Sequence, residues 1–315
     1  MQHTSHANSD IADLLLVNPS AGGGRAGATL PELRKFANQR GWNVEICVTE
    51  NANEFAEKAR RAAEAGRKRI FVLGGDGTFQ LLINAVAGHP ETILGVIPAG
   101  GGNDLAAALG LPDDPVKAAA LLLEGEVYHL DAARVHTADG TERLYTGGGG
   151  VGLDAEAARY ASGAYRNLRG RLRYLLAAIR ALFGFHAMRV RITTGDCEPE
   201  HLEATVLLVG ILNTPSYGAG LYLAPDAKTD DGKLELVLVE DLSVLQILAL
   251  LPAFASRGEL KTKRLRRFST ERVWIETESP RWFHGDGELL GMTPVEVCVV
   301  PRAVLVLRPA QRIKD

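Results

Sequence analysis

Three glycine-rich segments lie in the first third of the chain, and each follows a short apolar run. They read NPSAGGGRA at 18–26, GGDGT at 74–78 and PAGGGND at 98–104. Glycine lets backbone N–H groups approach an anion closely, and a helix that begins after the glycines adds the positive end of its dipole. The three segments therefore predict loops that bind a chain of phosphate groups.

Two of these loops also carry an acid, Asp76 in one and Asp104 in the other. A carboxylate repels phosphate unless a divalent cation lies between them or the carboxylate has to accept a proton. The two acids therefore indicate Mg²⁺ or proton-transfer chemistry. The alternative interpretation is that GGDGT is a tight turn in which Asp76 only caps the next helix.

Several other kinds of site are not supported. GGGRAG at 22–27 is not followed by the acid that a dinucleotide-binding fold carries after its second strand, and no GxxxxGK[ST] sequence occurs. Three widely separated cysteines without Cys/His spacing argue against a disulfide framework or a zinc site. A formal net charge of -3 gives no overall attraction for nucleic acid, so we expect no nucleic-acid partner.

Strand-like and helical patterns alternate in the first part of the chain. Apolar runs predict strands at DLLLVNP, NVEICVT, RIFVLG and ILGVIPA, and spacing typical of helices occurs between them in TLPELRKFANQRG, NEFAEKARRAAEAG and TFQLLINAVAG. This alternation predicts a parallel sheet covered by helices on both faces. Since ligands bind beyond the carboxyl ends of such strands, we expect the three glycine-rich loops to face one crevice.

After residue 127 the pattern changes to short strand-like runs separated by turns such as TGDCEPE, TDDG and HGDGE, with one helical stretch at about 155–186. This pattern predicts an antiparallel, β-rich second domain. The expected organisation is a disordered polar tail at 1–10, an α/β nucleotide-binding domain at 11–127, a β-rich substrate domain at 128–304 and a C-terminal segment at 305–315 that can return to the first domain.

The sequence carries no signal for export or for crossing a membrane. The first ten residues lack the basic start and apolar stretch of a signal peptide. The longest apolar run, at 242–255, has about 14 residues where a bilayer-spanning helix needs roughly 20. We therefore expect a cytoplasmic protein.

Taken together, these motifs resemble the catalytic domain that diacylglycerol kinases share with sphingosine kinases, ceramide kinases and bacterial lipid kinases. The similarity spans nearly the whole chain, because the motifs occur in the family's order: LLVNPSAGGGRA, VLGGDGTFQLLINAV, GVIPAGGGNDLAAALGLP, GGGGVGLDAEAA, GILNTPSYGAGLYLAPDAKTDDGKLELVLVE and HGDGE. The resemblance implies an NAD kinase/diacylglycerol kinase-like fold. In it, an N-terminal α/β domain and a C-terminal β-sandwich-like domain bring ATP and a lipid together in the cleft between them.

The resemblance also implies roles for individual residues. Asp76 is expected to act on the phosphates through Mg²⁺ and water, Asp104 to shape or polarise the acceptor side, and Glu288 to accept the proton. The residues expected to hold the nucleotide are Asn18, Thr49, Gly74, Gly75, Asp76, Gly77, Thr78, Gly100, Gly101 and Asn103.

Phosphoryl transfer requires a positioned γ-phosphate, neutralisation of its charge and removal of a proton from the acceptor hydroxyl. Backbone amides and Mg²⁺ suit the first two tasks, and either Glu288 or Asp76 suits the third. The chemistry does not choose between these carboxylates, and only the resemblance assigns the proton to Glu288. Without the ordered motifs, Glu288 would be read as an acid in a hairpin turn.

The segment APDAKTDDGKLEL resembles the family's structural metal loop. The resemblance implies that the carboxylate of Asp231 and the carbonyl oxygens of Lys228 and Lys233 hold the metal. On its own, the DDG sequence is typical of a simple turn.

Three positions depart from the family's pattern. The family's pattern has a phosphate-facing lysine near the first loop, and Arg25 takes its place here. Gly101 replaces a threonine of the nucleotide loop, and Leu81 replaces a glutamate that follows GGDGT by three residues. Because backbone amides survive these changes, we expect ATP binding to persist with altered affinity or preference.

Two basic segments suggest peripheral contact with the inner face of the membrane. One is KTKRLRRF at 261–268, and the other, at 166–191, combines an apolar stretch with Arg166, Arg169, Arg171, Arg173 and Arg180. A basic amphipathic segment can lie on an anionic bilayer, with each basic residue contributing on the order of 1 kcal/mol. The alternative is a helix that packs on the second domain and exposes a solvated basic face.

We therefore predict an ATP-dependent, Mg²⁺-requiring lipid kinase that phosphorylates a hydroxyl of a diacylglycerol-like or sphingoid-like lipid. One alternative is an NAD kinase, which shares the GGDGT loop and the two-domain plan. Another is a lipid- or nucleotide-binding regulatory module whose kinase site has decayed. The sequence carries no local signature of the acceptor lipid and none of the oligomeric state.

Overall fold

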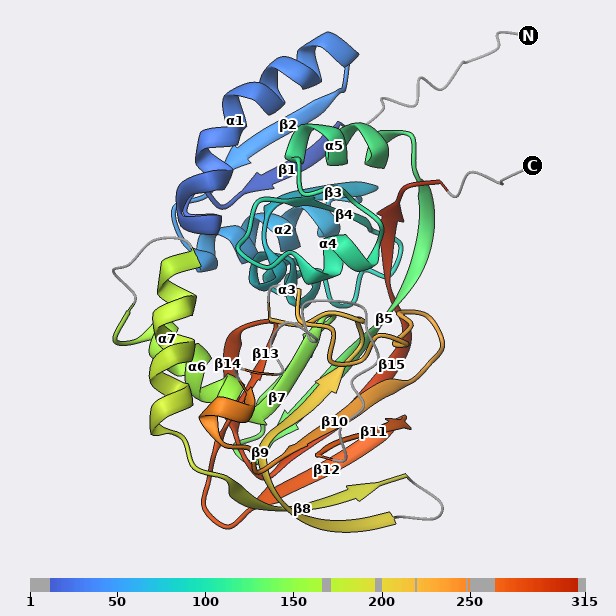
Figure 1. Cartoon of the computed structure of the whole chain (residues 1–315). Coiled ribbons are helices and arrows are strands. Elements are labelled where there is room, and N and C mark those ends of the chain that lie inside the picture. The colour runs from blue at the N-terminus through green and yellow to red at the C-terminus, as the bar shows by residue number, and fades with distance from the viewer. Residues whose placement is uncertain are drawn as a thin grey trace, which may run out of the picture.

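The computed structural model describes residues 12–165, 171–195, 200–218, 220–247, 249 and 264–310 (Figure 1). The expected polar tail therefore lies outside the described residues. So do Arg166 and Arg169 of the first basic segment, residues 261–263 of the second, and the last five residues of the chain. None of the helices in the described part of the chain has the length and apolar character needed to cross a bilayer.

A parallel four-stranded sheet forms the first half of the structure. Its strand order is β4-β3-β1-β2, with β1 at Asp13–Val17, β2 at Val44–Val48, β3 at Arg69–Gly74 and β4 at Ile93–Pro98. The predicted parallel α/β domain is confirmed. Helices cover both faces of the sheet, so nearly all residues of β1 and β3 are buried. This explains why both strands are almost continuously apolar in sequence.

Five helices cover this sheet: α1 (Ala21–Arg40), α2 (Ala52–Glu64), α3 (Asp76–Ala85), α4 (Asp104–Ala108) and α5 (Pro115–Leu123). α1 packs with α5, and α2 packs with α3. α1 connects β1 to the edge strand β2, and α2 leads from β2 back across the sheet to β3. Because both crossovers are right-handed, the two helix pairs lie on opposite faces of the sheet (Figure 1). Local signals define the ends, for example the side chain of Asn51, which accepts the N–H of Glu54 at the start of α2.

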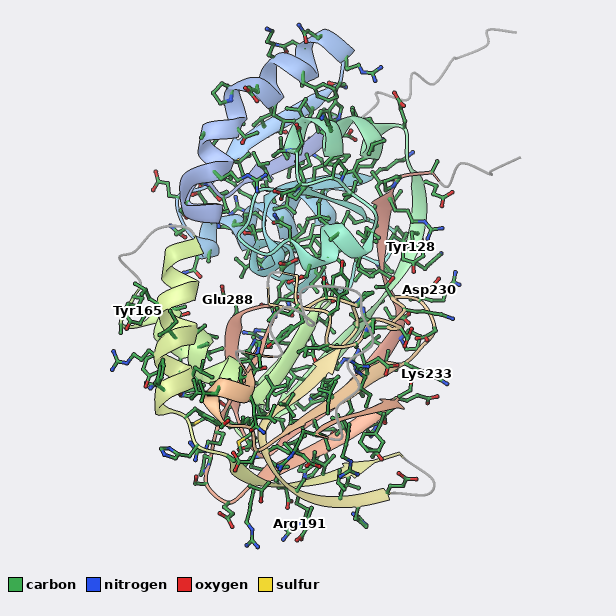
Figure 2. All side chains as sticks on the ribbon, viewed as in Figure 1. Tyr128, Tyr165, Arg191, Asp230, Lys233 and Glu288 are labelled. Atoms are coloured by element: carbon green, nitrogen blue, oxygen red, sulfur yellow. The ribbon has the colours of Figure 1, made fainter. Side chains whose placement is uncertain are left out.

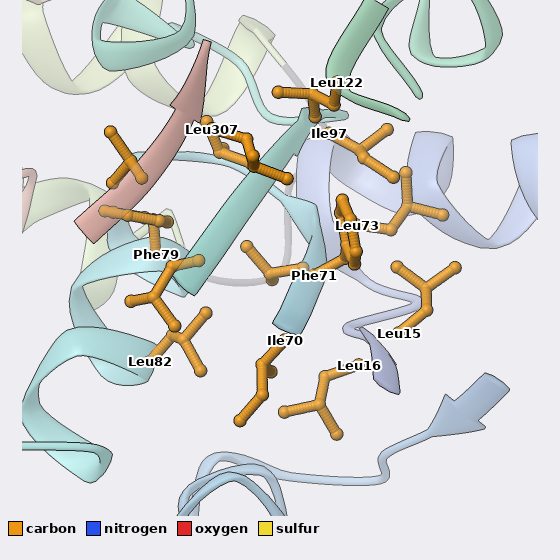
Figure 3. Close-up of a cluster of buried hydrophobic side chains, with 14 of the residues drawn as sticks. Leu15, Leu16, Ile70, Phe71, Leu73, Phe79, Leu82, Ile97, Leu122 and Leu307 are labelled. Atoms are coloured by element: carbon orange, nitrogen blue, oxygen red, sulfur yellow. The ribbon is translucent and has the colours of Figure 1, made fainter. Parts of the chain in front are cut away.

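The core of this half lies between the sheet and its helices (Figure 3). Leu15, Ile70, Phe71 and Leu73 of the central strands are completely buried. They pack against helix residues such as Phe79, which is also completely buried. This dense packing fixes the strand ends, from which the glycine-rich loops emerge.

The second half is antiparallel. Its strands are β5 (Glu126–Thr137), β6 (Glu142–Tyr145), β7 (Gly148–Gly152), β8 (Met188–Thr194), β9 (Glu200–Leu212), β10 (Leu234–Glu240), β11 (Leu265–Thr270), β12 (Arg272–Thr277), β13 (Trp282–Gly285), β14 (Glu288–Met292) and β15 (Val295–Arg308). They pair antiparallel with one another and enclose a second core that includes Val135, Tyr145, Ile192 and Phe283. The predicted antiparallel second domain is confirmed, and the expected helical stretch consists of two helices, α6 (Leu153–Ser162) and α7 (Arg171–Gly184).

Two long strands, β5 and β15, belong to both halves. They pair with each other along almost their full length, with an irregularity between Val300 and Val304. The end of β15 also pairs in parallel with β4, where Leu305 lies opposite Ile93. The boundaries that we propose at 127/128 and 304/305 fall inside these two strands, so the halves are joined by shared β-structure.

The first glycine-rich segment differs from the expected loop. Gly22, Gly23 and Gly24 have positive φ angles of 62°, 72° and 101° at the beginning of α1, so they form a left-handed turn from which the helix continues. The expected single strand in RLYTGGGGVG is also divided, into β6 and β7. In both places the glycines change the direction of the chain.

Candidate active site

The three glycine-rich loops touch one another at the carboxyl ends of β1, β3 and β4. A Cβ atom added to Gly22 would lie 2.1 Å from the carbonyl oxygen of Ala99, and one added to Gly100 would lie 2.4 Å from the Cα of Gly75. Such distances exclude any side chain at these glycines. The three loops therefore converge at one edge of the sheet, as expected.

Polar side chains line the β1 and β3 side of this edge. The Nδ2 of Asn18 donates to the Oγ1 of Thr78 over 3.4 Å, and a Cβ at Gly74 would lie 2.7 Å from the same oxygen. Thr49 is buried and its hydroxyl donates to the carbonyl of Val17, so it supports the end of β1. Gly77 follows at the first turn of α3.

Asn103 organises the third loop. Its Oδ1 accepts the N–H of Gly100 at 2.8 Å, and its own φ of 62° is left-handed. The side chain of Asp113 binds both Asn103 and Arg25 (2.9 and 3.1 Å). Arg25 is therefore tied to this loop, next to the half-buried Gly101.

Asp76 is the first residue of α3, which places it where the N–H groups of the first turn open toward the crevice. Its two carboxylate oxygens accept the N–H groups of Asp104 and Leu105 (3.2 and 3.1 Å). Burial, with the charge of Asp104 as a second cause, raises the pKa of Asp76 to about 6 despite these hydrogen bonds. Asp76 thus joins the second and third loops.

Asp104 is buried at the start of α4 and faces the second half of the chain. Its Oδ1 accepts the hydroxyl of Ser216 (2.8 Å) and the N–H of Gly220 (3.0 Å), both from the segment between β9 and β10. The structure therefore brings Asp76 and Asp104 together through the backbone of Asp104, as their equivalent places in the sequence suggest.

Asp286 is a member of this group that sequence reasoning did not select. It sits in the turn between β13 and β14 with a φ of 50°, and its carboxylate accepts the N–H groups of Thr146, Gly147 and Gly148. Burial, followed by the charge of Asp76, raises the pKa of Asp286 to about 7. The available signal was its position between two glycines in HGDGE, two residues before Glu288.

Glu288 begins β14 and is exposed (Figure 2). Its Oε1 lies 3.1 Å from the place that a Cβ of Gly77 would occupy, and the carbonyl oxygen of Asp286 lies 3.6 Å from it. Glu288 of GDGE and Gly77 of GGDGT therefore face each other where the two halves of the chain meet.

Two amide side chains fix this interface. The buried Gln80 of α3 donates to the carbonyl of Gly285 (3.1 Å), which directly precedes Asp286. One turn further along α3, Asn84 donates to the carbonyl of Leu144 and accepts its N–H (2.8 and 2.9 Å). α3 thus carries Asp76 at one end and binds the second half along its length.

The acidic group fits a divalent cation supplied with phosphates. In the described part of the chain, no Lys or Arg forms an ion pair with Asp76 or Asp286, and their carboxylates accept backbone N–H groups. The described residues contain no cluster of three or more His, Cys, Asp or Glu side chains that could hold a metal ion alone. Mg²⁺ in phosphoryl-transfer sites is typically bound by one or two carboxylates, with the remaining ligands from phosphates and water.

The expected metal loop lies well away from Glu288, on the other side of the molecule (Figure 2). Asp231 is exposed, and its Oδ1 accepts the N–H of Lys233 at 3.1 Å. The neighbouring Gly232 donates to the fully buried Asp131, which anchors the loop to β5. Lys228 is exposed at the start of the same loop.

Two family models match the chain. Residues 13–135 match the model "Diacylglycerol kinase catalytic domain", and residues 147–308 match "YegS C-terminal NAD kinase beta sandwich-like domain". The two matches correspond to the parallel and antiparallel halves described above.

Similar proteins share both halves. A diacylglycerol kinase of Mycobacterium tuberculosis is 29% identical over 295 residues, covering 93% of this chain and 94% of the relative. "Probable lipid kinase YegS-like" of Pectobacterium atrosepticum is 27% identical over 306 residues, covering 96% and 97%. The solved structure of a diacylglycerol kinase from Bacillus anthracis has the same fold, with a TM-score of 0.71, 21% identity and coverage of 94% and 96%. The chain therefore belongs to the family of lipid kinases that join a diacylglycerol kinase catalytic domain to a YegS-type C-terminal domain.

Proposed function

We propose that the protein transfers the γ-phosphate of ATP to a hydroxyl of a diacylglycerol-like or sphingoid-like lipid. The observation that carries this proposal is the position of Glu288, which comes from the second half and lies over Gly77 at the N-terminus of α3. A helix N-terminus attracts phosphate, and an adjacent carboxylate can accept the proton of an attacking hydroxyl. Phosphate donor and acceptor would meet between these two groups.

The nucleotide side of the site is built from backbone. The loops at 22–24, 74–78 and 100–103 present N–H groups at the strand ends, and the first turn of α3 adds its dipole. Asn18 and Thr78 would contribute side-chain hydrogen bonds there, and Thr49 would support the loop from below. Arg25 lies near enough to the third loop to contribute positive charge.

The acceptor side depends on carboxylates with different surroundings. Glu288 is exposed beside the N-terminus of α3, where its carboxylate would take the proton of the lipid hydroxyl. Asp76 is held by backbone N–H groups at the helix start, where it would orient the phosphates. Asp104 would shape the wall on the acceptor side. When bound, Mg²⁺ would neutralise charge on the phosphates, and Asp76 is the residue that we assign to it.

A second metal ion would stabilise the fold without taking part in catalysis. We assign it to the carboxylate of Asp231 and to the carbonyl oxygens of Lys228 and Lys233, in the loop that Asp131 anchors to β5. The charges of Asp231 and Asp226 contribute to a raised pKa of Glu235, whose first cause is burial. A cation in this acidic loop would relieve that repulsion.

Access to a lipid would come from a membrane surface. The outer face of α7 exposes Phe183 (71%) and Ile179 (42%) beside the exposed Arg180. An exposed apolar face with adjacent basic charge is suited to an anionic bilayer. We therefore propose peripheral attachment to the inner face of the membrane through α7. The second basic segment would assist.

The first test is transfer of labelled γ-phosphate to diacylglycerol, monoacylglycerol, sphingosine, ceramide and a polyprenol in mixed micelles, with NAD as a soluble acceptor. We expect one lipid class to be labelled, and both Asp76→Asn and Glu288→Gln to abolish the product. Labelled NADP would instead identify an NAD kinase. ATP binding without transfer to any acceptor would identify a regulatory module.

A further inference from the structure

Three polar side chains of the second half, the buried His284 and the half-buried Asp154 and Tyr217, meet beside β7 and have no part in the mechanism above. The hydroxyl of Tyr217 donates to the Oδ2 of Asp154 (2.6 Å), and the Nε2 of His284 donates to the same oxygen (2.9 Å). Tyr217 and His284 also share a hydrogen bond, and their rings stack with centroids 5.7 Å apart. We call these three residues the polar triad.

The triad occupies space that glycines leave open. A Cβ at Gly148 would lie 2.6 Å from the Tyr217 ring, and one at Gly150 would lie 2.7 Å from the Oδ2 of Asp154. His284 is 3% exposed and lies opposite Gly150 in the β13–β7 pair. The glycine run of β7 therefore makes room for a polar cluster inside a sheet.

His284 is oriented entirely through one nitrogen. Its Nδ1 is buried and has no hydrogen-bond partner among the described residues. The Nε2 atom lies within hydrogen-bonding distance of both Asp154 and Tyr217, so its one N–H is shared between their oxygens. A buried polar group with an unpaired nitrogen costs stability, and such a cost indicates a role beyond packing.

Tyr217 is also the first residue of a tight hairpin. It exchanges two backbone hydrogen bonds with Leu221, each 2.9 Å long, and Gly218 and Gly220 inside the turn have positive φ angles. Side chains at both ends of this turn, Tyr217 and Leu221, pack against the small core that includes Leu212 and Leu223. The ring and hydroxyl of Tyr217 are therefore one of the attachments that set the position of the turn.

The same hairpin holds Asp104. Ser216, directly before Tyr217, donates its hydroxyl to the Oδ1 of Asp104, and Gly220 donates its N–H to the same oxygen. The backbone N–H of Asp104 in turn donates to Asp76. A continuous series of contacts thus runs from the triad in the second half to the acids of the first half.

We propose that Asp154, His284 and Tyr217 are positioning residues that set the location of Asp104, and through it the acceptor side of the site, by fixing the backbone pair of Tyr217 and Leu221 beside Ser216 and Gly220. This inference rests on the proposed function, because it assigns Asp104 to the acceptor hydroxyl. A displacement of about 1 Å in a reacting geometry can cost up to about 100-fold in rate. The triad would therefore act on turnover without touching the nucleotide.

The test is a double-mutant cycle on lipid phosphorylation. Tyr217→Phe removes one hydroxyl and keeps the ring that fills the space over Gly148. Ser216→Ala removes one of the two donors to Asp104. The control is Tyr145→Phe, which removes another buried tyrosine hydroxyl of the second half, bonded to the carbonyl of Ile211.

We expect Tyr217→Phe and Ser216→Ala each to lower kcat about tenfold, and the double variant to lose about the same amount, because both act through one hairpin. KM for ATP should stay within about twofold, and Tyr145→Phe should keep its kcat. If Tyr217→Phe does not fold, Asp154→Asn replaces it in the cycle, because it removes the charge of the shared acceptor of Tyr217 and His284 and keeps the size of the side chain.

Two results would overturn the inference and can be told apart. If the unaltered protein phosphorylates a lipid but the two losses multiply, or if Tyr145→Phe loses as much kcat as Tyr217→Phe, the triad acts only through stability. If the unaltered protein phosphorylates no lipid at all, the proposed function fails and the inference fails with it.

Discussion

Glu288 lies directly over Gly77, so that its Oε1 is 3.1 Å from the position of a missing Cβ. The two residues are more than 200 positions apart in the sequence. Gly77 ends a Gly-Asp-Gly sequence of the first half, and Glu288 directly follows one in the second half. A side chain at Gly77 would have to displace the Glu288 carboxylate by a few tenths of an ångström. The glycine therefore lets this carboxylate lie close to the helix N-terminus.

Replacing Glu288 by Gln should abolish turnover while ATP still binds. The substitution removes the proton acceptor and keeps the size of the side chain, so kcat should fall by about 100-fold to 10,000-fold. The measurement is lipid phosphorylation together with ATP binding by calorimetry. Glu278→Gln, at an exposed ion pair with Arg189, is the matched control. Comparable turnover of the two variants would remove Glu288 from the mechanism.

The stability of the protein without Mg²⁺ and nucleotide should decrease as the pH rises. The pKa values of Asp76 and Asp286 are raised from 3.8 to about 6 and about 7, so both groups bind protons more tightly in the folded chain than in the unfolded chain. Their contribution to the free energy of unfolding is complete below about pH 4 and is lost as the pH rises through their folded pKa values.

Thermal unfolding between about pH 5 and about pH 8 measures this effect, and Asp286→Asn should flatten the dependence. Asp139→Asn is the control, because hydrogen bonds from Thr137 and Thr141 lower the pKa of Asp139 and it does not titrate in this range. A wild-type curve that is flat or rises with pH would contradict the prediction.

Replacing Gly100 by Ala should separate the second and third glycine-rich loops. The added Cβ would lie 2.4 Å from the Cα of Gly75, where only backbone could move. We expect a loss of about 1 to 3 kcal/mol in the free energy of unfolding and weaker ATP binding. Denaturant unfolding and ATP titration measure both effects. Gly184→Ala, where no atom lies within 4 Å, should change neither.

Removing Mg²⁺ should lower the melting temperature as well as activity if a metal occupies the loop of Asp231. A chelator should therefore destabilise the unaltered protein, and Asp231→Asn should lose this response. Asp139→Asn is a matched control, since both acids accept the N–H of the second residue after them at 3.1 Å. An unchanged melting temperature with chelator would exclude the structural metal.

Replacing Gln80 by Leu should uncouple α3 from the second half. The carbonyl of Gly285 would lose its buried partner, and the spacing between Asp76 and Glu288 would loosen. We expect kcat to fall about tenfold with a smaller change in ATP affinity. Gln39→Leu, on the exposed face of α1, is the control. Equal kcat values for the two variants would show that Gln80 does not set the spacing.

The fold and the phosphate-binding loops of the first half can be predicted from the sequence, because both depend on short-range patterns. Asp76 and Asp104 stand in glycine-rich turns after apolar strands, and the edge rule of parallel sheets brings such turns together. Asp286, Tyr217 and His284 were not selected, because their partners lie 63 to 140 positions away and no periodicity encodes a contact at that range. The Gln80 to Gly285 contact spans 205 positions.

The glycine run of β7 shows the same limit from another direction. In sequence, TGGGGVG is typical of a weak strand or a loop. In the structure, Gly148 admits a tyrosine ring, Gly150 admits a carboxylate, and Gly147 donates its N–H to Asp286. The residues that need this space are supplied by α6, by the hairpin and by β13, so the reason for each glycine appears only once the chain is folded.

The pairing of β15 with β4 sets an order of events during synthesis. Leu305 and Val306 cover the edge of the parallel sheet beside Ile93 and Leu94, although they are made some 200 residues later. Until β15 leaves the ribosome, β4 has a row of unpaired N–H and C=O groups on that edge. The parallel sheet of the nascent first half therefore keeps an unpaired edge strand, which could pair incorrectly, until nearly the whole second half has been translated.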